Sequence, residues 1–250
     1  MTATQRRLLF LASGAVFAAV LLAGFAKLPD FGDYHGPYGT ILNRVAVPQR
    51  HATDVVTAVN FDYRAFDTLG EEFILFAAVL GVAVVLREVR GERHRASDLP
   101  GEDHHFPGSS AVLGAFGLML IGPVLVLGLY IVSHGAITPG GGFQGGVILA
   151  AASLVVFLAG EYVAMKRLAP HAVVEASEAA GAAGYGLVGL GGLIAGAAFF
   201  HNFLPLGTPA QLLSAGTIPV SNLAVGLEVA GAFLLLWTEF LDQALVVRGR

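Results

Sequence analysis

Carboxylate side chains inside long apolar runs are the residues of this sequence best suited to chemistry. Glu228 is flanked by Leu227 and Val229 near the middle of such a run, and an ionisable group at that depth in a membrane is by default functional. Glu239 returns to nearly the same helix face about 16 Å further along, and Asp242 lies close to that face. One interpretation is that these carboxylates form a proton relay. The other is that Glu228 is a single buried, protonated residue hydrogen-bonded to another helix, while Glu239 and Asp242 lie at the membrane interface.

A second acidic pair stands where another apolar run begins. Asp67 and Glu71 are spaced i, i+4 and therefore share one face of a helix. Asp67 is favoured as the N-cap of that helix, with Thr68 as a rival cap, and a place on an ion path is its alternative role. Glu71, one turn deeper, is expected on the ion path, whereas Glu72 points elsewhere and is expected to face water.

Two histidines and one further glutamate lie near the ends of apolar runs. An imidazole can carry a proton near neutral pH, so His134 is a candidate on the proton path. A hydrogen-bonded structural role is nevertheless the commoner one for a lone histidine such as His134 or His201. Glu161 closely precedes Lys166 and Arg167 and is expected to form an interfacial ion pair.

A glycine-rich turn lies between two of the apolar runs. Its residues are Pro139, Gly140, Gly141, Gly142, Phe143, Gly145 and Gly146. The stretch lacks the GxxxxGK[ST] pattern of phosphate-binding loops. Two interpretations stay open: a tight turn that lets membrane helices pack closely, or a functional re-entrant corner. Elsewhere, Gly192 and Gly196 form a small-residue pair that favours close helix–helix contact.

The elements that carry these residues are predicted to be membrane helices. The sequence is 55% hydrophobic and only 13% charged, whereas a soluble domain carries roughly a quarter charged residues. Runs of about 20 apolar residues can cross a bilayer. They occur at residues 8–26, 68–86, 110–133, 144–165, 184–204 and 219–241. The predicted fold class is therefore an all-α integral membrane protein with about six transmembrane helices.

The distribution of Lys and Arg predicts that both termini are cytoplasmic. This orientation leaves most basic residues inside, namely Arg6, Arg7, Arg87, Arg90, Arg93, Arg95, Lys166, Arg167, Arg248 and Arg250. The others fall in one outer loop, namely Lys27, Arg44, Arg50 and Arg64. The first apolar run is expected to be a retained helix rather than a cleaved signal peptide, because it is longer than the usual apolar part of a signal.

Two hydrophilic stretches organise the chain. Residues 29–66 begin with turn signals and become periodic at 55–59, which predicts a short interfacial helix followed by an extended piece. Residues 87–108 contain His94, His104 and His105, whose spacing fits no recognised metal site, so this stretch is expected to be a solvated linker. The predicted organisation is a two-helix module at 1–90, a cytoplasmic linker at 91–108 and a four-helix module at 109–250.

Two stretches resemble subunits of cation/proton antiporters. His134 and Gly135 followed by residues 139–146, together with residues 222–226, resemble the MnhB/MrpB subunit of Mrp-type multisubunit Na⁺/H⁺ antiporters. Residues 54–71, DVVTAVNFDYRAFDTLGE, resemble the MbhE-like module, which forms the C-terminal end of MrpA or a separate small subunit in membrane-bound hydrogenases. The resemblance implies an MbhE-like module at 1–90 fused to an MnhB-like module at 109–250. It also implies that Glu71 lies on an ion path.

The leading functional hypothesis is a membrane subunit of a multisubunit Na⁺/H⁺ antiporter in a prokaryotic cell membrane. Such a subunit conducts Na⁺ or H⁺ beside MrpA-, MrpC- and MrpD-like partners, without a cofactor or covalent chemistry of its own. The alternatives are a structural subunit that moves no ion, and a membrane-arm subunit of a redox-driven, complex I-related assembly. The absence of cysteine excludes thiol chemistry and iron–sulfur clusters in this subunit. The sequence also lacks the basic clusters interleaved with aromatic residues that are typical of nucleic-acid binding.

Overall fold

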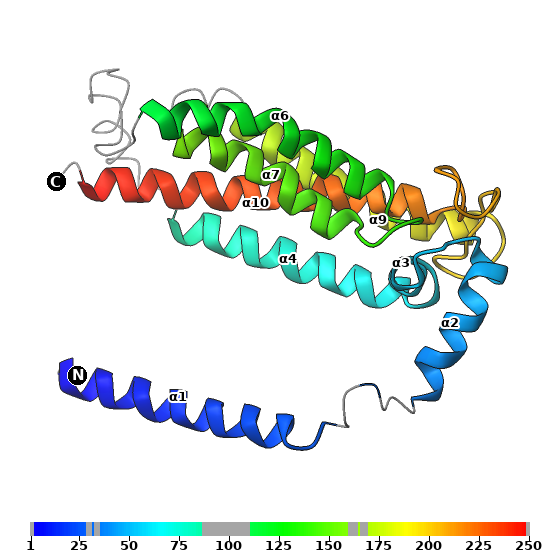
Figure 1. The fold of residues 1–250 in the computed structure, drawn as a ribbon, viewed down its shortest axis with the longest axis horizontal. Coiled ribbons are helices and arrows are strands. Elements are labelled where there is room, and N and C mark those ends of the chain that lie inside the picture. The colour runs from blue at the N-terminus through cyan, green and yellow to red at the C-terminus, as the bar shows by residue number, and fades with distance from the viewer. Residues whose placement is uncertain are drawn as a thin grey trace. The chain divides into compact units, whose positions relative to one another are not determined.

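The structure is a computed structural model in which every described element is a helix (Figure 1). It describes residues 3–28, 32, 36–86, 111–159, 165 and 170–248. The chain forms two compact units, Met1–Ile41 and Leu42–Arg250. Glu161, the linker histidines and the basic residues of the linker lie outside the described residues.

The first unit contains α1 (Ala3–Phe25), an apolar helix whose described side chains are all exposed. Its segment Arg7–Phe25 is long and apolar enough to cross a membrane, as expected from the run at 8–26. Such an apolar surface suits a helix that contacts lipid or other membrane helices. Helix α2 (Pro37–Arg50) begins in this unit and ends in the second.

The second unit is a bundle arranged around α10 (Ile218–Arg248). The other elements of this unit are α3 (Val55–Ala58), η1 (Val59–Tyr63), α4 (Ala65–Leu86), α6 (Ala111–Ser133), α7 (Gly142–Leu158) and α9 (His171–Ile194). Helix α10 contacts α4, α6, α7 and α9. In Figure 1 it runs lengthwise between α4 and the pair α6–α7. Residues on different faces of α10 therefore meet side chains from four other helices.

Four of the described helices are long and apolar enough to cross a membrane. They are Arg7–Phe25, Ala65–Leu86, Gly114–Ser133 and Ile218–Leu241, and Gly142–Leu158 is a shorter apolar helix. These helices confirm the predicted all-α membrane class. The cytoplasmic placement of both termini stays a prediction.

The span predicted at residues 184–204 is wrong. The helix is α9, which begins at His171 and ends at Ile194. It ends early because Gly196 adopts a φ of +80°, a left-handed conformation that stops a helix. It begins early because the segment before residue 184 is rich in alanine and glutamate, which favour helix without being apolar enough to stand out as a span. The shift brings Glu178 into the bundle.

The segment before α4 is helical rather than extended, which corrects the prediction for residues 60–66. Asp54 caps α3, because its Oδ1 accepts hydrogen bonds from the backbone N–H groups of Val56 at 3.0 Å and Thr57 at 3.5 Å. The chain then forms the π-helical turn η1, and Thr68 Oγ1 donates to the Asn60 carbonyl at 2.7 Å. This bond ties the turn to α4. The helix α2 was not foreseen from the sequence.

The glycine-rich turn joins α6 to α7 by close backbone packing. Gly140 and Gly141 have φ values of +153° and +127°, which residues with a Cβ atom rarely adopt. A Cβ atom at Gly142 would lie 2.6 Å from the Asn222 carbonyl oxygen, and one at Gly145 would lie 2.8 Å from the Val132 nitrogen. Larger residues at these positions would force α7 away from α10 and α6.

The first turn of α7 is capped by a side chain from another helix. The residue before α7, Gly141, has no side chain that could cap it, and Asn222 Oδ1 of α10 accepts from the Gly142 N–H at 2.8 Å. Asn222 Nδ2 donates back to the Ile218 carbonyl at 3.2 Å, and the side chain is fully buried. One amide therefore fixes the start of α7 against α10.

Candidate functional site

Three buried carboxyl groups from three helices form the candidate site. Glu72 of α4 and Glu178 of α9 are 2% exposed, and Glu228 of α10 is 0% exposed. Glu72 and Glu228 are adjacent, and Glu178 is within electrostatic reach of Glu228. We call these three residues the carboxyl cluster.

Each helix presents its carboxyl group because of the face that it packs. On α4, the buried residues Thr68, Glu72 and Val79 recur at helical spacing and line the face toward α9 and α10. Helices α9 and α10 approach at two glycines. A Cβ atom at Gly181 would lie 2.6 Å from the Cα of Glu228, and one at Gly231 would lie 2.7 Å from the backbone nitrogen of Glu178.

The carboxyl cluster has no partner within the described part of the chain that could neutralise it. Both carboxyl oxygens of Glu72 and of Glu228, and Oε1 of Glu178, are buried without a hydrogen-bond partner there. Helices α4 and α9 contain no Lys or Arg, and in α10 the only one is Arg248 at its far end. Because a charge buried without a partner costs several kcal/mol, the cluster is a site where protons, ions or water must supply the missing interactions.

Two apolar layers enclose the carboxyl cluster along the bundle. Toward the start of α4, Tyr185 donates its hydroxyl to the Ala65 carbonyl at 2.9 Å and packs edge-on against Phe61 with ring centroids 5.8 Å apart. Toward the opposite end, the buried side chains are Val79, Val174, Ala232 and Leu235. The cluster therefore lies between apolar layers, where electrostatic interactions are strong.

The structure contradicts the expectation that Glu72 faces water. Glu72 is buried, whereas Glu71 is exposed and makes no hydrogen bond or ion pair within the described residues. Asp67 is the third residue of α4 rather than its cap, and it forms an exposed ion pair with Arg64. Thr68 is not the cap either, since its hydroxyl bonds to η1.

The expected column along α10 is interrupted. Glu239 lies beyond the apolar layer that includes Ala232 and Leu235, and its Oε1 is 3.2 Å from Nε2 of His171. The side chain of Asp242 lies outside the described residues. The structure thus separates Glu239 from Glu228 and brings Glu72 and Glu178 to Glu228 instead.

The two histidines near the other end of the bundle have different settings. His134 Nδ1 donates to the Tyr130 carbonyl at 3.1 Å, and the two rings stack with centroids 4.0 Å apart. These contacts are compatible with a hydrogen-bonded structural role, and the place of His134 on the proton path stays a prediction. His201 is exposed, and its backbone packs on α9, where a Cβ atom at Gly192 would lie 2.6 Å from the His201 nitrogen. Gly196 follows the helix, and a Cβ there would meet nothing within 4 Å, so within the described residues it makes no close helix contact beside Gly192; its role in packing against another subunit stays a prediction.

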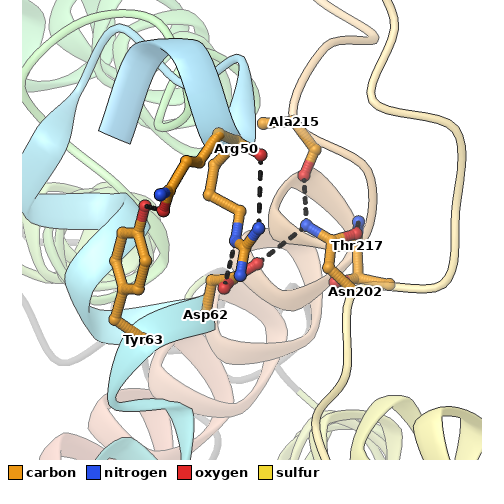
Figure 2. A network of polar contacts seen from close by, with 7 residues as sticks. Arg50, Asp62, Tyr63, Asn202, Ala215 and Thr217 are labelled. Atoms are coloured by element: carbon orange, nitrogen blue, oxygen red, sulfur yellow. Dashed lines mark hydrogen bonds and ion pairs between the residues drawn. The ribbon is translucent and has the colours of Figure 1, made fainter. Parts of the chain in front are cut away.

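A polar network joins the connecting segments at this end of the second unit (Figure 2). Asp62 accepts from Arg50 Nε at 2.5 Å and from Asn202 Nδ2 at 2.9 Å. Asn202 also accepts from the Thr217 N–H at 2.8 Å. Burial raises the pKa of Tyr63, and the nearby Arg50 guanidinium opposes that shift. The network holds α2, η1 and the loop before α10 together, and so fixes the start of α4.

The described residues contain no group of three or more His, Cys, Asp or Glu side chains arranged to hold a metal ion. The three members of the carboxyl cluster are therefore near one another without converging on one point.

Of the three members of the carboxyl cluster, the sequence analysis singled out only Glu228 as a functional candidate. Glu178 was missed because its segment was placed outside the membrane, and the signal that could have found it is the spacing of Glu178, Gly181 and Tyr185 on one helix face.

Comparisons with known proteins identify the family of this chain. The family described as a domain related to the MnhB subunit of Na⁺/H⁺ antiporter matches residues 112–235. An uncharacterized protein of Methanocaldococcus jannaschii is 33% identical over 221 residues, which is 78% of this chain and 81% of that protein. The chain belongs to the MnhB family. It is thus a multi-pass subunit of a multisubunit cation/proton antiporter in a prokaryotic membrane, and other antiporter subunits are its partners.

Two solved structures contain chains similar to this MnhB-family chain. One belongs to the membrane-bound sulfane sulfur reductase, an archaeal respiratory membrane complex, with a TM-score of 0.71, 30% identity, and coverage of 95% of this chain and 98% of that chain. The other belongs to the Mrp complex from Dietzia sp. DQ12-45-1b, with a TM-score of 0.71 and 24% identity. It covers 96% of this chain but 26% of that longer chain, and at this identity it shows the fold alone.

Proposed function

We propose that this chain transfers protons within a multisubunit Na⁺/H⁺ antiporter, and that Glu72, Glu178 and Glu228 are the groups that carry them. The observation that supports this most directly is the carboxyl cluster itself: three groups from three helices, buried and without counter-charges. Natural membrane proteins keep such groups where an ion or proton pathway needs them. A purely structural role would be served as well by apolar side chains of similar volume.

Binding of protons lowers the free-energy cost of burying the carboxyl cluster. Three adjacent carboxylates cannot all be charged in a dry interior, because each like charge disfavours its neighbour. A protonated Glu72 can donate a hydrogen bond to an ionised Glu228, and the proton can then move from one oxygen to the other. Glu178 extends the exchange to α9. Titration of such a group belongs to the whole cluster rather than to one residue.

Protons suit the carboxyl cluster better than a bare metal cation does. Hard cations take about six or more oxygen ligands arranged around one point, and the described residues offer no such convergence. We therefore assign proton transfer to this subunit and leave the sodium path to other parts of the antiporter. No bond-making chemistry is part of the proposal.

The exposed face of α4 is assigned to the partner subunits. Glu71 lies on this face, one turn after Asp67. The face also contains Gly70 and Gly81, and a Cβ atom at either glycine would meet nothing within 4 Å. A carboxylate on a spanning helix is costly against lipid. Glu71 therefore faces a helix of another antiporter subunit or a water-filled path between subunits, which keeps its proposed place on an ion path.

A second function is favoured by one observation. The chain covers 98% of a chain from an archaeal sulfur reductase complex at 30% identity, so the same subunit type serves a redox-driven assembly. In that setting the carboxyl cluster would move protons in response to electron transfer by partner subunits. Isolation of the native complex decides between the two, since only the redox-driven assembly contains subunits that carry redox centres.

The test of proton transfer is neutralisation of the carboxyl cluster in the whole complex. Glu228→Gln and Glu72→Gln keep size and hydrogen bonding but remove the proton that titrates. Both complexes should assemble and lose most Na⁺-driven proton exchange in membrane vesicles. Gly184→Ala is the control and should exchange normally, because its added Cβ atom would make only an ordinary contact of 3.5 Å with that of Ala224. Wild-type exchange by an assembled Glu228→Gln complex would show that the cluster carries no protons.

A further inference from the structure

Three protonatable side chains gather where α9 begins and α10 approaches its end. His171 Nδ1 is 3.4 Å from Glu175 Oε1, and His171 Nε2 is 3.2 Å from Glu239 Oε1. The side chains of His171 and Glu175 are 57% and 58% exposed, whereas that of Glu239 is 20% exposed. One imidazole therefore bridges two carboxylates from two helices at one end of the bundle, where two of the three side chains are exposed. We call these residues the His171 group.

The His171 group leads along α9 to the carboxyl cluster. Residues 171, 175 and 178 follow the i, i+4, i+7 pattern and lie on one face of the helix. Glu178 is one turn beyond Glu175, about 4.5 Å further along the axis, and the two are within electrostatic reach of each other. Glu178 is 2% exposed, and its Oε1 has no partner within the described residues.

One feature favours this route over the one along α10. The apolar layer at this end contains Ala232 and Leu235 on α10, which fill the inward-facing positions between Glu239 and Glu228, and Val174 on α9. On α9, however, Glu175 follows Val174 directly and lies one turn before Glu178, so a protonatable group borders the layer there.

We propose that His171, Glu175 and Glu239 collect protons from water and pass them through Glu175 to Glu178, and so to Glu228 and Glu72. The inference rests on the proposed function, because it supplies the entrance to that proton path. Protonated His171 breaks its Nδ1–H bond, and the proton forms an O–H bond on the carboxylate of Glu175. Glu175 then releases this proton to ionised Glu178. His171 regains a proton from water or from a buffer acid, so charge and atoms balance over the cycle.

Glu239 holds the imidazole in place during this transfer. Its carboxylate accepts from Nε2, which orients Nδ1 toward Glu175. Glu239 is thus a positioning residue, whereas His171 and Glu175 handle the proton. The two carboxylates also raise the local concentration of protons at this end, since negative groups attract cations from solution.

The test uses the complete antiporter complex in vesicles and compares dilute with concentrated imidazole buffer. His171→Gln and Glu175→Gln should each slow Na⁺-driven proton exchange severalfold in dilute buffer. Concentrated imidazole should restore most of the rate in His171→Gln, because it can deliver protons to the exposed Glu175, whereas Glu175→Gln should stay slow because Glu178 is buried. His201→Ala is the control. His201 is an exposed histidine in the loop that follows α9, so the complex with this substitution should exchange protons at the wild-type rate in both buffers.

The outcomes separate the inference from the proposed function. Exchange at the wild-type rate in dilute buffer by both variants, with Glu228→Gln inactive, overturns the inference and leaves the proposed function intact. Slowing of His171→Gln that concentrated imidazole does not relieve also overturns it, because the His171 group would then act only as a structural ion pair. Full activity of Glu228→Gln overturns the proposed function. Both variants alter exposed side chains, so assembly should survive in each.

Discussion

Gly181→Ala should separate α9 from α10 at the carboxyl cluster. The added Cβ atom would lie 2.6 Å from the Ala224 carbonyl oxygen and 2.6 Å from the Cα of Glu228, whereas ordinary contacts begin at 3.4 Å. The obstructing atoms are backbone, so no side-chain rotation can relieve the overlap. The backbone nitrogen of Glu228 would lie closer still, so the two helices must move apart by roughly 1 Å in a close-packed interior. That movement carries Glu178 away from Glu228.

The loss of stability caused by overpacking at Gly181 can be isolated with a matched control substitution on the same helix. Gly184→Ala places its Cβ atom 3.5 Å from that of Ala224, an ordinary contact. Both substitutions gain about 1 kcal/mol of helix propensity, so this gain cancels in the comparison. What remains is the cost of overpacking at Gly181, which is about 1–3 kcal/mol. Gly184→Ala should be neutral or stabilising.

Two measurements check this prediction on the purified complex. The thermal dissociation midpoint should fall for Gly181→Ala and hold or rise for Gly184→Ala. Proton exchange should slow in Gly181→Ala alone, because proton transfer between carboxyl groups depends steeply on their separation. Identical stability and exchange in the two variants would refute the close helix contact and, with it, the account of how Glu178 reaches Glu228.

Three further outcomes are expected. Asn222→Leu should destabilise the chain by about 1–3 kcal/mol, because the first N–H of α7 loses its buried acceptor; an unchanged denaturation midpoint would show that water can replace the amide. Gly192→Leu should reduce assembly in a native gel more than Leu187→Ala does, since only the former meets backbone atoms, and equal band intensities would argue against this. Reporters fused at Gly140 and at Arg93 should report opposite sides of the membrane if both termini are cytoplasmic, and signals from the same side would exclude that topology.

The sequence by itself determined the class of the protein and part of its packing. Low charge and long apolar runs require membrane helices, because backbone polar groups must be satisfied internally in lipid. Glu228 was recognisable because its immediate neighbours are apolar for several residues on each side. The glycine-rich turn was recognisable too, since several glycines in a row after a proline indicate a close backbone approach.

Tertiary structure decided which carboxyl groups meet. Glu71 and Glu72 are neighbours with nearly the same sequence surroundings, and one residue of rotation, about 100° around the helix, decides which one is buried. That rotation is set by the helices that α4 packs against, so α9 and α10 bury Glu72 and leave Glu71 exposed. Local sequence holds no information on the direction of a partner helix.

The same reason explains Glu178 and Asn222. Glu178 lies in a segment of alanine and glycine with weak apolar character, and only the contact between Gly181 and α10 shows that this segment crosses the bundle. Asn222 caps α7 from α10, across 80 positions of sequence, so no pattern near Gly142 could predict its cap. Sequence fixes which faces are able to pack, and only the assembled bundle chooses which of those faces meet, because that choice depends on contacts between residues far apart in the chain.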